Sequence, residues 1–391
     1  MKQLMRNGRG LHSWTQTLRG GKSLSGINVG TVASLLLLLI LVPVLSTHAA
    51  SKVGNRLGTE VCAITAFFNP FRFASRVANF AAARAWSEKQ GLAMLVVELA
   101  FDSDPFELSD QLRYSTQAVT KFLRRRTSRQ NILWHKEALL NIALQGLESF
   151  AEFDTCTKIV WLDSDVILED GWIEATSEML ERYKIGQPYT HVVRLPRGTF
   201  MPYAYWSEPR MERMGYGIAE GQVQWSYAKR FGKGVGGHTG FAWAARRDVL
   251  TSVGLYDRAI VGGFDALLAH AIVDPRCEAR LNSQMAHHFE EYAVNARSTF
   301  GTELGYPNRT VKAATYWHGE NKDRSYQDRH LILLKHTYDP SRDVRLDSTG
   351  VLVWTDQVSP NLREEVMETL RQRREDGVAV DSSERNRCEQ T

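Results

Sequence analysis

The chain has 391 residues, 43% of them apolar and 24% charged, which suffices for one large α/β domain or two smaller ones and argues against a disordered protein. Seven Lys or Arg residues precede the first acidic residue, Glu60, so the net charge of +4 is concentrated at the N-terminus and the rest of the chain is near −3. A nucleic-acid-binding protein would carry a basic patch on its folded body, so no nucleic-acid partner is expected.

The N-terminal segment has the composition of a membrane anchor. Residues 1–26 are basic, and the uncharged run Ile27–Leu45 within residues 27–46 has about the length needed to cross a hydrocarbon core of roughly 30 Å. The positive-inside rule keeps residues 1–26 in the cytoplasm and predicts a single-pass type II membrane protein of the secretory pathway, with the Golgi as the expected organelle. The alternative is a signal peptide cleaved near Ala49, which also sends the body into the secretory pathway.

The cysteines and one short motif indicate which metal sites and covalent modifications are possible. The four cysteines include no CxxC pair, which argues against a zinc site of that type, and they allow at most two disulfides. The triplet that begins at Asn308 (Asn-Arg-Thr) is a glycosylation acceptor pattern, which has meaning only if the body is lumenal.

The body begins with alternating strand and helix signals. Residues 60–68 predict a buried strand, 73–89 a helix and 92–99 a second strand, which form a β-α-β unit typical of a parallel sheet. Apolar residues at helical spacing predict a further helix over 130–150, followed by the strand KIVWL at 158–162. These patterns predict an α/β fold with a mainly parallel sheet.

The later regions are less regular. Residues 190–240 are rich in aromatic residues, Gly and Pro, which predicts strands and mobile loops. Ser359 as N-cap and Pro360 at the first position predict a C-terminal helix. The polar run Asp376–Thr391 is expected to be disordered.

Two acidic residues follow the apolar strand at 158–162. Asp163 and Asp165 are two positions apart, so an extended backbone places both carboxylates on the same side. Hard oxygen ligands of this kind suit Mg²⁺ or Mn²⁺, which in turn neutralise a nucleotide diphosphate. The alternative is a solvated turn after a strand.

This Asp-Ser-Asp motif after a buried strand resembles that of the GT-A glycosyltransferases. Downstream, the chain carries the glycine pair Gly236-Gly237, the segment Phe241-Ala242-Trp243, the turn Gly254-Leu255 and then Gly262-Gly263-Phe264-Asp265. This order resembles the C-terminal half of the β-1,4-galactosyltransferases and the polypeptide GalNAc-transferases. The resemblance implies a GT-A-like, Rossmann-like nucleotide-diphospho-sugar transferase sandwich.

The resemblance also assigns a base. By match, Asp265 removes the proton of the acceptor hydroxyl in an in-line displacement that inverts the anomeric configuration. Phe264 replaces the family's Glu and the Trp usual before the glycines is missing, so acceptor recognition is expected to differ. The alternative for Asp265 is a helix N-cap, in which case His238 is the next candidate base.

A metal ligand far along the chain follows from the same resemblance. The family's distal metal-binding His matches His318 in the segment Tyr-Trp-His-Gly, so the expected metal set is Asp163, Asp165 and His318 with Mn²⁺ or Mg²⁺. Where the galactosyltransferases often supply a Met ligand, this chain has Thr315, a place that water can fill.

Further residues are candidates for substrate contact. Arg324 and Arg329 are expected to complement the donor's diphosphate, with solvated surface cations as the alternative. Three residues of the N-terminal half are candidate donor contacts, with capping or packing as the alternative: Asn69, Glu98 and Asn141. Two residues of the C-terminal half are candidate acceptor or loop residues: His238 and Trp243.

The predicted organisation is a nucleotide-sugar-binding half at 58–190, an acceptor-binding and catalytic half at 191–355, and a helix with a disordered tail at 356–391. The predicted activity is transfer of a sugar from a nucleotide sugar, a UDP-sugar in preference to a GDP-sugar, to a hydroxyl of a glycan, protein or lipid. The alternatives are a non-catalytic glycan-binding protein on a degenerate transferase fold and a metal-dependent nucleotidyl- or phosphotransferase.

Overall fold

The computed structural model describes residues 60–109, 118–200, 237–273, 281–326 and 328–377. The predicted membrane anchor at 27–46 lies outside them, and within these ranges no helix is long and apolar enough to cross a membrane. From Leu57 onward the chain forms one compact unit, so the two predicted halves share one body.

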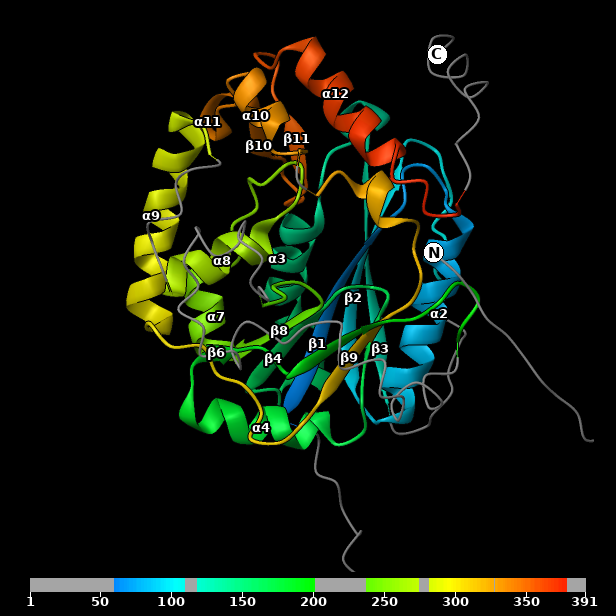
Figure 1. Cartoon of the computed structure of the whole chain (residues 1–391), viewed down its shortest axis with the longest axis vertical. Coiled ribbons are helices and arrows are strands. Elements are labelled where there is room, and N and C mark those ends of the chain that lie inside the picture. The colour runs from blue at the N-terminus through cyan, green and yellow to red at the C-terminus, as the bar shows by residue number, and fades with distance from the viewer. Residues whose placement is uncertain (1–59, 110–117, 201–236, 274–280, 327, 378–391) are drawn as a thin grey trace, which may run out of the picture. The chain divides into compact units, whose positions relative to one another are not determined.

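The centre of this unit is a six-stranded sheet with the order β3-β2-β1-β4-β8-β6 (Figure 1). The first four strands in that order run parallel to one another, and β8 and β6 add antiparallel pairings at one edge. The strands are β1 (Val61–Phe68), β2 (Ala93–Phe101), β3 (Thr120–Thr127), β4 (Lys158–Leu162), β6 (Ile185–Gly186) and β8 (Ala242–Arg246). The prediction of an α/β fold with a mainly parallel sheet is confirmed.

Helices cover both faces of the sheet. Successive residues of β1 point to opposite sides, so that Ile64 and Phe68 belong to one core cluster while Ala63 and Phe67 belong to another. The first cluster includes residues of α3 (Lys136–Gly146), α7 (Arg247–Val253), α8 (Phe264–Val273) and α9 (Ser283–Phe300), and the second includes residues of α2 (Ala74–Lys89) and α4 (Trp172–Arg182). Figure 1 shows α8 and α9 to the left of the sheet and α2 to its right. Burial on both faces explains why β1, β2 and β4 are almost wholly apolar.

The helices are α2 (Ala74–Lys89), α3 (Lys136–Gly146), α4 (Trp172–Arg182), α7 (Arg247–Val253), α8 (Phe264–Val273), α9 (Ser283–Phe300), α10 (Leu331–Lys335), α11 (Pro340–Asp343) and α12 (Pro360–Arg371). Short 3-10 turns lie at Arg129–Asn131, Leu147–Ser149, Ala151–Phe153 and Asn321–Arg324. A second sheet has the order β5-β9-β7, from Val166–Leu168, Lys312–Thr315 and His191–Arg194. A hairpin pairs β10 (Val344–Leu346) with β11 (Leu352–Trp354).

Most element predictions in the N-terminal half are confirmed, with two corrections. The helix predicted over 130–150 is shorter, because α3 starts at Lys136 and ends at Gly146, with 3-10 turns on either side. Strand β3 was not predicted, since its sequence TKFLRRRT carries three consecutive arginines in place of apolar residues. Position at the edge of the sheet, paired only with β2, allows these charged side chains to reach solvent.

The end of the described chain returns to the start of α2. The Asp376 carboxylate accepts hydrogen bonds from the backbone N–H groups of Ala74 and Ser75 at 2.9 and 2.7 Å. These are orphan donors of the first helical turn, so Asp376 acts as a cap supplied from a distant segment. The prediction that disorder begins at Asp376 is therefore wrong for this residue, because its charge is used by the helix terminus.

One disulfide joins β1 to the residues before β4. Cys62 and Cys156 are both buried, with Cα atoms 5.7 Å apart. This pair is one of the two disulfides that the sequence allows.

Candidate functional site

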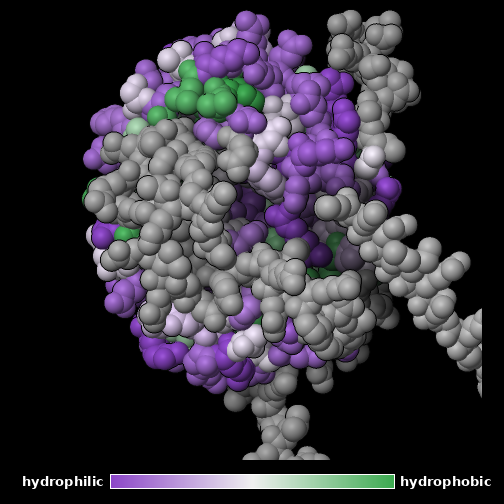
Figure 2. Space-filling view, viewed as in Figure 1, coloured by the Kyte–Doolittle hydropathy of each residue, from purple (hydrophilic) through white to green (hydrophobic). Residues whose placement is uncertain are grey.

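The candidate site is a pocket of about 360 Å³ at the carboxyl ends of β1 and β4. Phe68 ends β1 and Leu162 ends β4, and both line the pocket. Ligands of open α/β sheets bind at this edge. Figure 2 shows a hollow on this face bordered by mainly hydrophilic surface, which is appropriate for a polar ligand.

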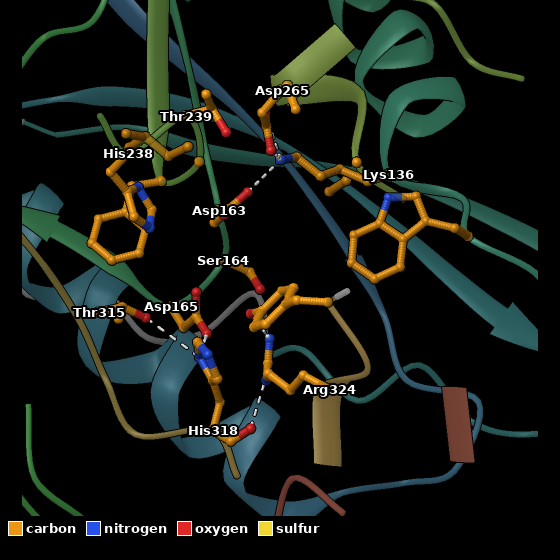
Figure 3. Close-up of a pocket in the computed structure, with 18 of the residues that line it drawn as sticks. Lys136, Asp163, Ser164, Asp165, His238, Thr239, Asp265, Thr315, His318 and Arg324 are labelled. Atoms are coloured by element: carbon orange, nitrogen blue, oxygen red, sulfur yellow. Dashed lines mark hydrogen bonds and ion pairs between the residues drawn. The ribbon is translucent and has the colours of Figure 1, made fainter. Parts of the chain in front are cut away.

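Asp165 and His318 meet on one side of the pocket. The Asp165 carboxylate accepts a hydrogen bond from His318 Nδ1, although the two residues are 153 positions apart (Figure 3). Strand pairing explains the contact: Asp165 precedes β5, which pairs with β9, and His318 follows β9. Burial opposes ionisation of Asp165, but His318 and Arg324 outweigh it and lower the pKa of its carboxyl. The structure thus brings these two predicted ligands together, and their role as metal ligands stays a prediction.

Asp163 faces the other side of the pocket. Its carboxylate lies 2.6 Å from the ammonium group of Lys136, at the start of α3, and the same nitrogen lies 3.3 Å from the carboxylate of Asp265. Figure 3 shows the lysine between the two acids. Burial lowers the pKa of Lys136, but Asp163 and Asp265 outweigh it and raise that pKa. Lys136 is therefore a fixed positive charge that joins the two predicted functional acids.

Asp265 does not act as a helix cap. It stands in the first turn of α8, where Ala266 N–H donates to the backbone oxygen of Gly263, and its side chain bonds to Lys136. Burial raises the pKa of the Asp265 carboxyl, and the charge of Lys136 opposes that rise. A carboxylate with a raised pKa is a stronger base than an exposed one, which is the property required for proton abstraction.

His238 and Gly240 form the wall opposite Lys136. A side chain at Gly240 would place its Cβ 3.3 Å from the His238 ring and 3.9 Å from the Asp265 carboxylate, so the glycine keeps the space between them open. Burial lowers the pKa of His238 to about 4, so this imidazole is neutral at pH 7. His238 lies 4.3 Å from the ring of Phe241 and lines the pocket as the sequence analysis expected.

The two predicted arginines also line the pocket. Arg324 donates to the backbone oxygen of His318 at 3.0 Å, which places it on the side of Asp165. Arg329 lies on the other side, where a Cβ at Gly263 would be 3.5 Å from its guanidinium. Neither is a solvated surface cation, because Arg324 is buried and Arg329 is partly buried.

Four predicted contact residues do not line the pocket. Asn69 bonds to the backbone of Phe73 at the start of α2, and Asn141 bonds to the backbone of Leu255. Glu98 accepts from the backbone N–H groups of Glu107 and Leu108. Trp243 stacks on a second tryptophan inside the sheet core. These residues therefore have capping or packing roles, which was the alternative given for the predicted donor contacts.

Several residues that line the pocket were not predicted from the sequence. These are Arg76, Trp134, Lys136, Glu137, Arg194 and Arg373. Lys136 had one usable signal, since it occupies the start of a helix that faces the carboxyl ends of a parallel sheet. The remaining residues come from segments whose approach to the pocket depends on tertiary packing.

The side chains around Asp165 have the ligand types that a hard divalent cation prefers. These are the carboxylate of Asp165, the imidazole of His318 and the hydroxyl of Thr315, which lies 3.3 Å from that imidazole. Asp163 is engaged by Lys136 instead, so within the described residues no three His, Cys, Asp or Glu side chains are grouped closely enough to hold a metal. The three-ligand set stays a prediction.

Comparisons with known proteins give limited similarity. No protein-family model matches the chain, and no curated protein matches it in sequence. Among solved structures, the chain is similar to S. aureus TarS 1-349 in complex with UDP-GlcNAc, with 10% identity, 80% of this chain and 72% of that chain covered, and a TM-score of 0.35. For S. aureus TarS the identity is 8%, the coverage 72% of this chain and 41% of that chain, and the TM-score 0.33. Scores at this level leave the function to be argued from the site.

Proposed function

We propose that the protein is a metal-dependent glycosyltransferase that transfers a sugar from a nucleotide sugar to an acceptor hydroxyl with inversion. The observation that carries the proposal is the arrangement of one pocket, with Asp165 and His318 on one side and Asp265 on the other. A metal-binding pair and a separate base are the two parts that such a transfer requires.

The donor's diphosphate is assigned to the side of Asp165. Asp165 and His318 would hold a Mn²⁺ or Mg²⁺ ion, which would neutralise the charge of the leaving diphosphate. Arg324 is fixed next to His318 and adds a permanent positive charge there. Asp163 can join this group only by leaving Lys136, with which it pairs in the structure.

The acceptor is assigned to the side of Asp265. In the proposed step, the acceptor oxygen forms a bond to the anomeric carbon while the bond from that carbon to the diphosphate oxygen breaks. The hydroxyl proton passes to the Asp265 carboxylate, and the nucleoside diphosphate leaves. The charge of Lys136 favours the ionised form of Asp265, the form that can accept the proton, and so opposes the rise in pKa that burial causes.

Replacement of the base tests the proposal. Asp265→Asn keeps the size of the side chain and is expected to bind donor normally while turnover falls about 10²–10⁴-fold. UDP-GlcNAc, the ligand named for the TarS complex, is the first donor to test, followed by other nucleotide sugars. Transfer at the wild-type rate by this variant would eliminate Asp265 as the base and leave His238 as the next candidate.

A second variant tests the metal. Chelation is expected to abolish donor binding, Mn²⁺ is expected to restore it, and Asp165→Ala is expected to lose this response. Metal-dependent binding that survives in Asp165→Ala would remove the proposed ion site. Donor binding without any transfer would instead favour a glycan-binding protein, and transfer of phosphate or a nucleotidyl group would favour a phosphotransferase.

We also propose a location in the secretory pathway, with residues 27–46 as a signal anchor. The buried Cys62–Cys156 disulfide supports an oxidising compartment, and Asn308 of the glycosylation triplet is exposed. The protein is expected to resist alkaline extraction and to be protected from protease in sealed vesicles. Release of a shortened soluble protein would show cleavage near Ala49.

A further inference from the structure

Arginine and aromatic side chains form one wall of the pocket. The Arg373 guanidinium lies 4.9 Å from the ring centroid of Trp134, and the Arg329 guanidinium lies 5.3 Å from that of Tyr326. All four residues line the pocket. Contact with an aromatic ring restricts the orientation of a guanidinium while leaving its N–H groups available, so this wall is prepared for an anion.

The arginines near this wall outnumber the carboxylates that pair with them. Glu375 alone pairs with Arg76, Arg324 and Arg373, at 3.0, 3.3 and 2.8 Å. Arg329 has no carboxylate within ion-pair distance in the described part of the chain. Its positive charge is therefore available to a ligand.

Arg329 and Arg324 both lie on the Tyr326 ring, but they contact different parts of the pocket. A Cβ at Gly262 would lie 3.3 Å from the Arg329 guanidinium and one at Gly263 would lie 3.5 Å from it, so Arg329 contacts the turn that leads into Asp265. Arg324, by contrast, is bonded to the backbone of His318. An anion held by Arg329 on the side of Gly263 would therefore lie near Asp265, the proposed base, and so near the acceptor hydroxyl.

The charge of the whole pocket also favours a second anion besides the donor's diphosphate. Six basic side chains line it, against three Asp carboxylates and Glu137, and burial raises the pKa of Glu137 to about 8, so that this group is largely uncharged at pH 7. Even with Glu375 included, basic groups exceed ionised acids, and a divalent ion would add to the excess. A nucleotide sugar carries about two negative charges in its diphosphate, which is too few to balance both the excess of basic side chains and the divalent ion.

We propose that Arg329, with Arg373 on Trp134 beside it, forms an acceptor subsite for an oxyanion carried by the acceptor, a phosphate, sulfate or carboxylate close to the reacting hydroxyl. This inference rests on the proposed glycosyltransferase function and adds the class of acceptor. Bidentate contact from a guanidinium suits all three groups.

The first test compares matched acceptors on the full-length wild-type protein. A methyl hexoside is assayed against the same hexoside with a 6-phosphate or a 6-sulfate, and against the corresponding uronic acid. Charge-assisted hydrogen bonds typically contribute about 1.5–3 kcal/mol, so at least one charged acceptor is expected to have a kcat/KM about 10–100-fold above that of its neutral counterpart. Equal values for all four acceptors would overturn the inference, and this comparison needs no variant.

The second test uses Arg329→Met, which removes the charge but keeps a long side chain. The KM for the charged acceptor is expected to rise about 10–100-fold relative to the KM for the neutral acceptor, while the affinity for the nucleotide sugar alone stays unchanged. Arg345→Met is the matched control, since Arg345 is exposed and does not line the pocket. An equal loss of donor affinity in Arg329→Met would assign this arginine to the donor's diphosphate and overturn the inference.

The two proposals fail in different ways. Donor hydrolysis or transfer by the wild-type protein with no preference for charged acceptors would overturn the acceptor inference and leave the proposed function standing. Absence of binding for every nucleotide sugar tested would overturn both.

Discussion

Replacement of Lys136 by Met tests how the pocket controls its proposed base. The Lys136 ammonium lies 3.3 Å from the Asp265 carboxylate. Coulomb's law with an effective dielectric constant of about 20 gives about 5 kcal/mol for unit charges at this separation. The Asp265 side chain is 19% exposed, so water reduces this value. An opposite charge at such a distance typically changes the pKa of a carboxyl by about 1–3.

The sign of the effect follows from the charge of Lys136. Burial raises the pKa of Asp265 and Lys136 opposes the rise, so the pKa of Asp265 is expected to increase further when the lysine is lost. A base must be ionised to act, so activity of Lys136→Met is expected to fall at low pH and to recover as pH increases. The acidic limb of kcat/KM against pH should move upward by about 1–3 pH units.

The assay is kcat/KM for transfer from about pH 5 to about pH 9, with Lys136→Arg as the control that keeps the positive charge. Because Lys136 also contacts Asp163, donor affinity is measured separately at each pH. The same fractional loss at every pH, or an unmoved acidic limb, would show that Lys136 does not set the ionisation of Asp265.

Two further predictions concern stability. Glu375→Gln removes the shared partner of three arginines and is expected to lower the free energy of unfolding by about 3–5 kcal/mol, whereas Asp376→Ala, which removes only the α2 cap, should cost about 0.5–2 kcal/mol. Equal losses of unfolding free energy for these two variants in urea titrations would contradict the larger role assigned to Glu375. Burial opposes ionisation of Glu375, but its arginines hold the pKa of its carboxyl well below the usual range. Its contribution to stability is therefore present above about pH 4 and is lost as pH falls toward the folded-state pKa. Replacement of Cys62 and Cys156 by Ala removes a link across 94 positions and is expected to cost about 2–5 kcal/mol, so an unchanged Tm on reduction would argue against the disulfide.

The sequence predicted the elements whose pattern is local. Strands β1, β2 and β4 are apolar runs between clear breaks, and their place in a parallel sheet follows from the helices between them. The edge strand β3 has no such pattern, because its arginines are tolerated only by its position in the sheet. Resemblance in motif order also placed Asp165, Asp265 and His318 in one pocket, which no local pattern would have done.

The charges that control those residues were not predictable in the same way. Lys136 reaches Asp163 and Asp265 because α3 begins at the edge of the sheet where both acids lie, and Glu375 reaches the arginines because the chain returns to α2 after α12. Apart from the pair Arg373 and Glu375, each contact joins residues more than 25 positions apart, so its existence depends on the tertiary fold. The motif therefore identifies which groups are available for chemistry, while their protonation depends on neighbours that only the folded chain supplies. A functional test of this pocket has to change Lys136 as well as the residues of the motif, because the lysine opposes the rise in the pKa of Asp265 and also pairs with Asp163.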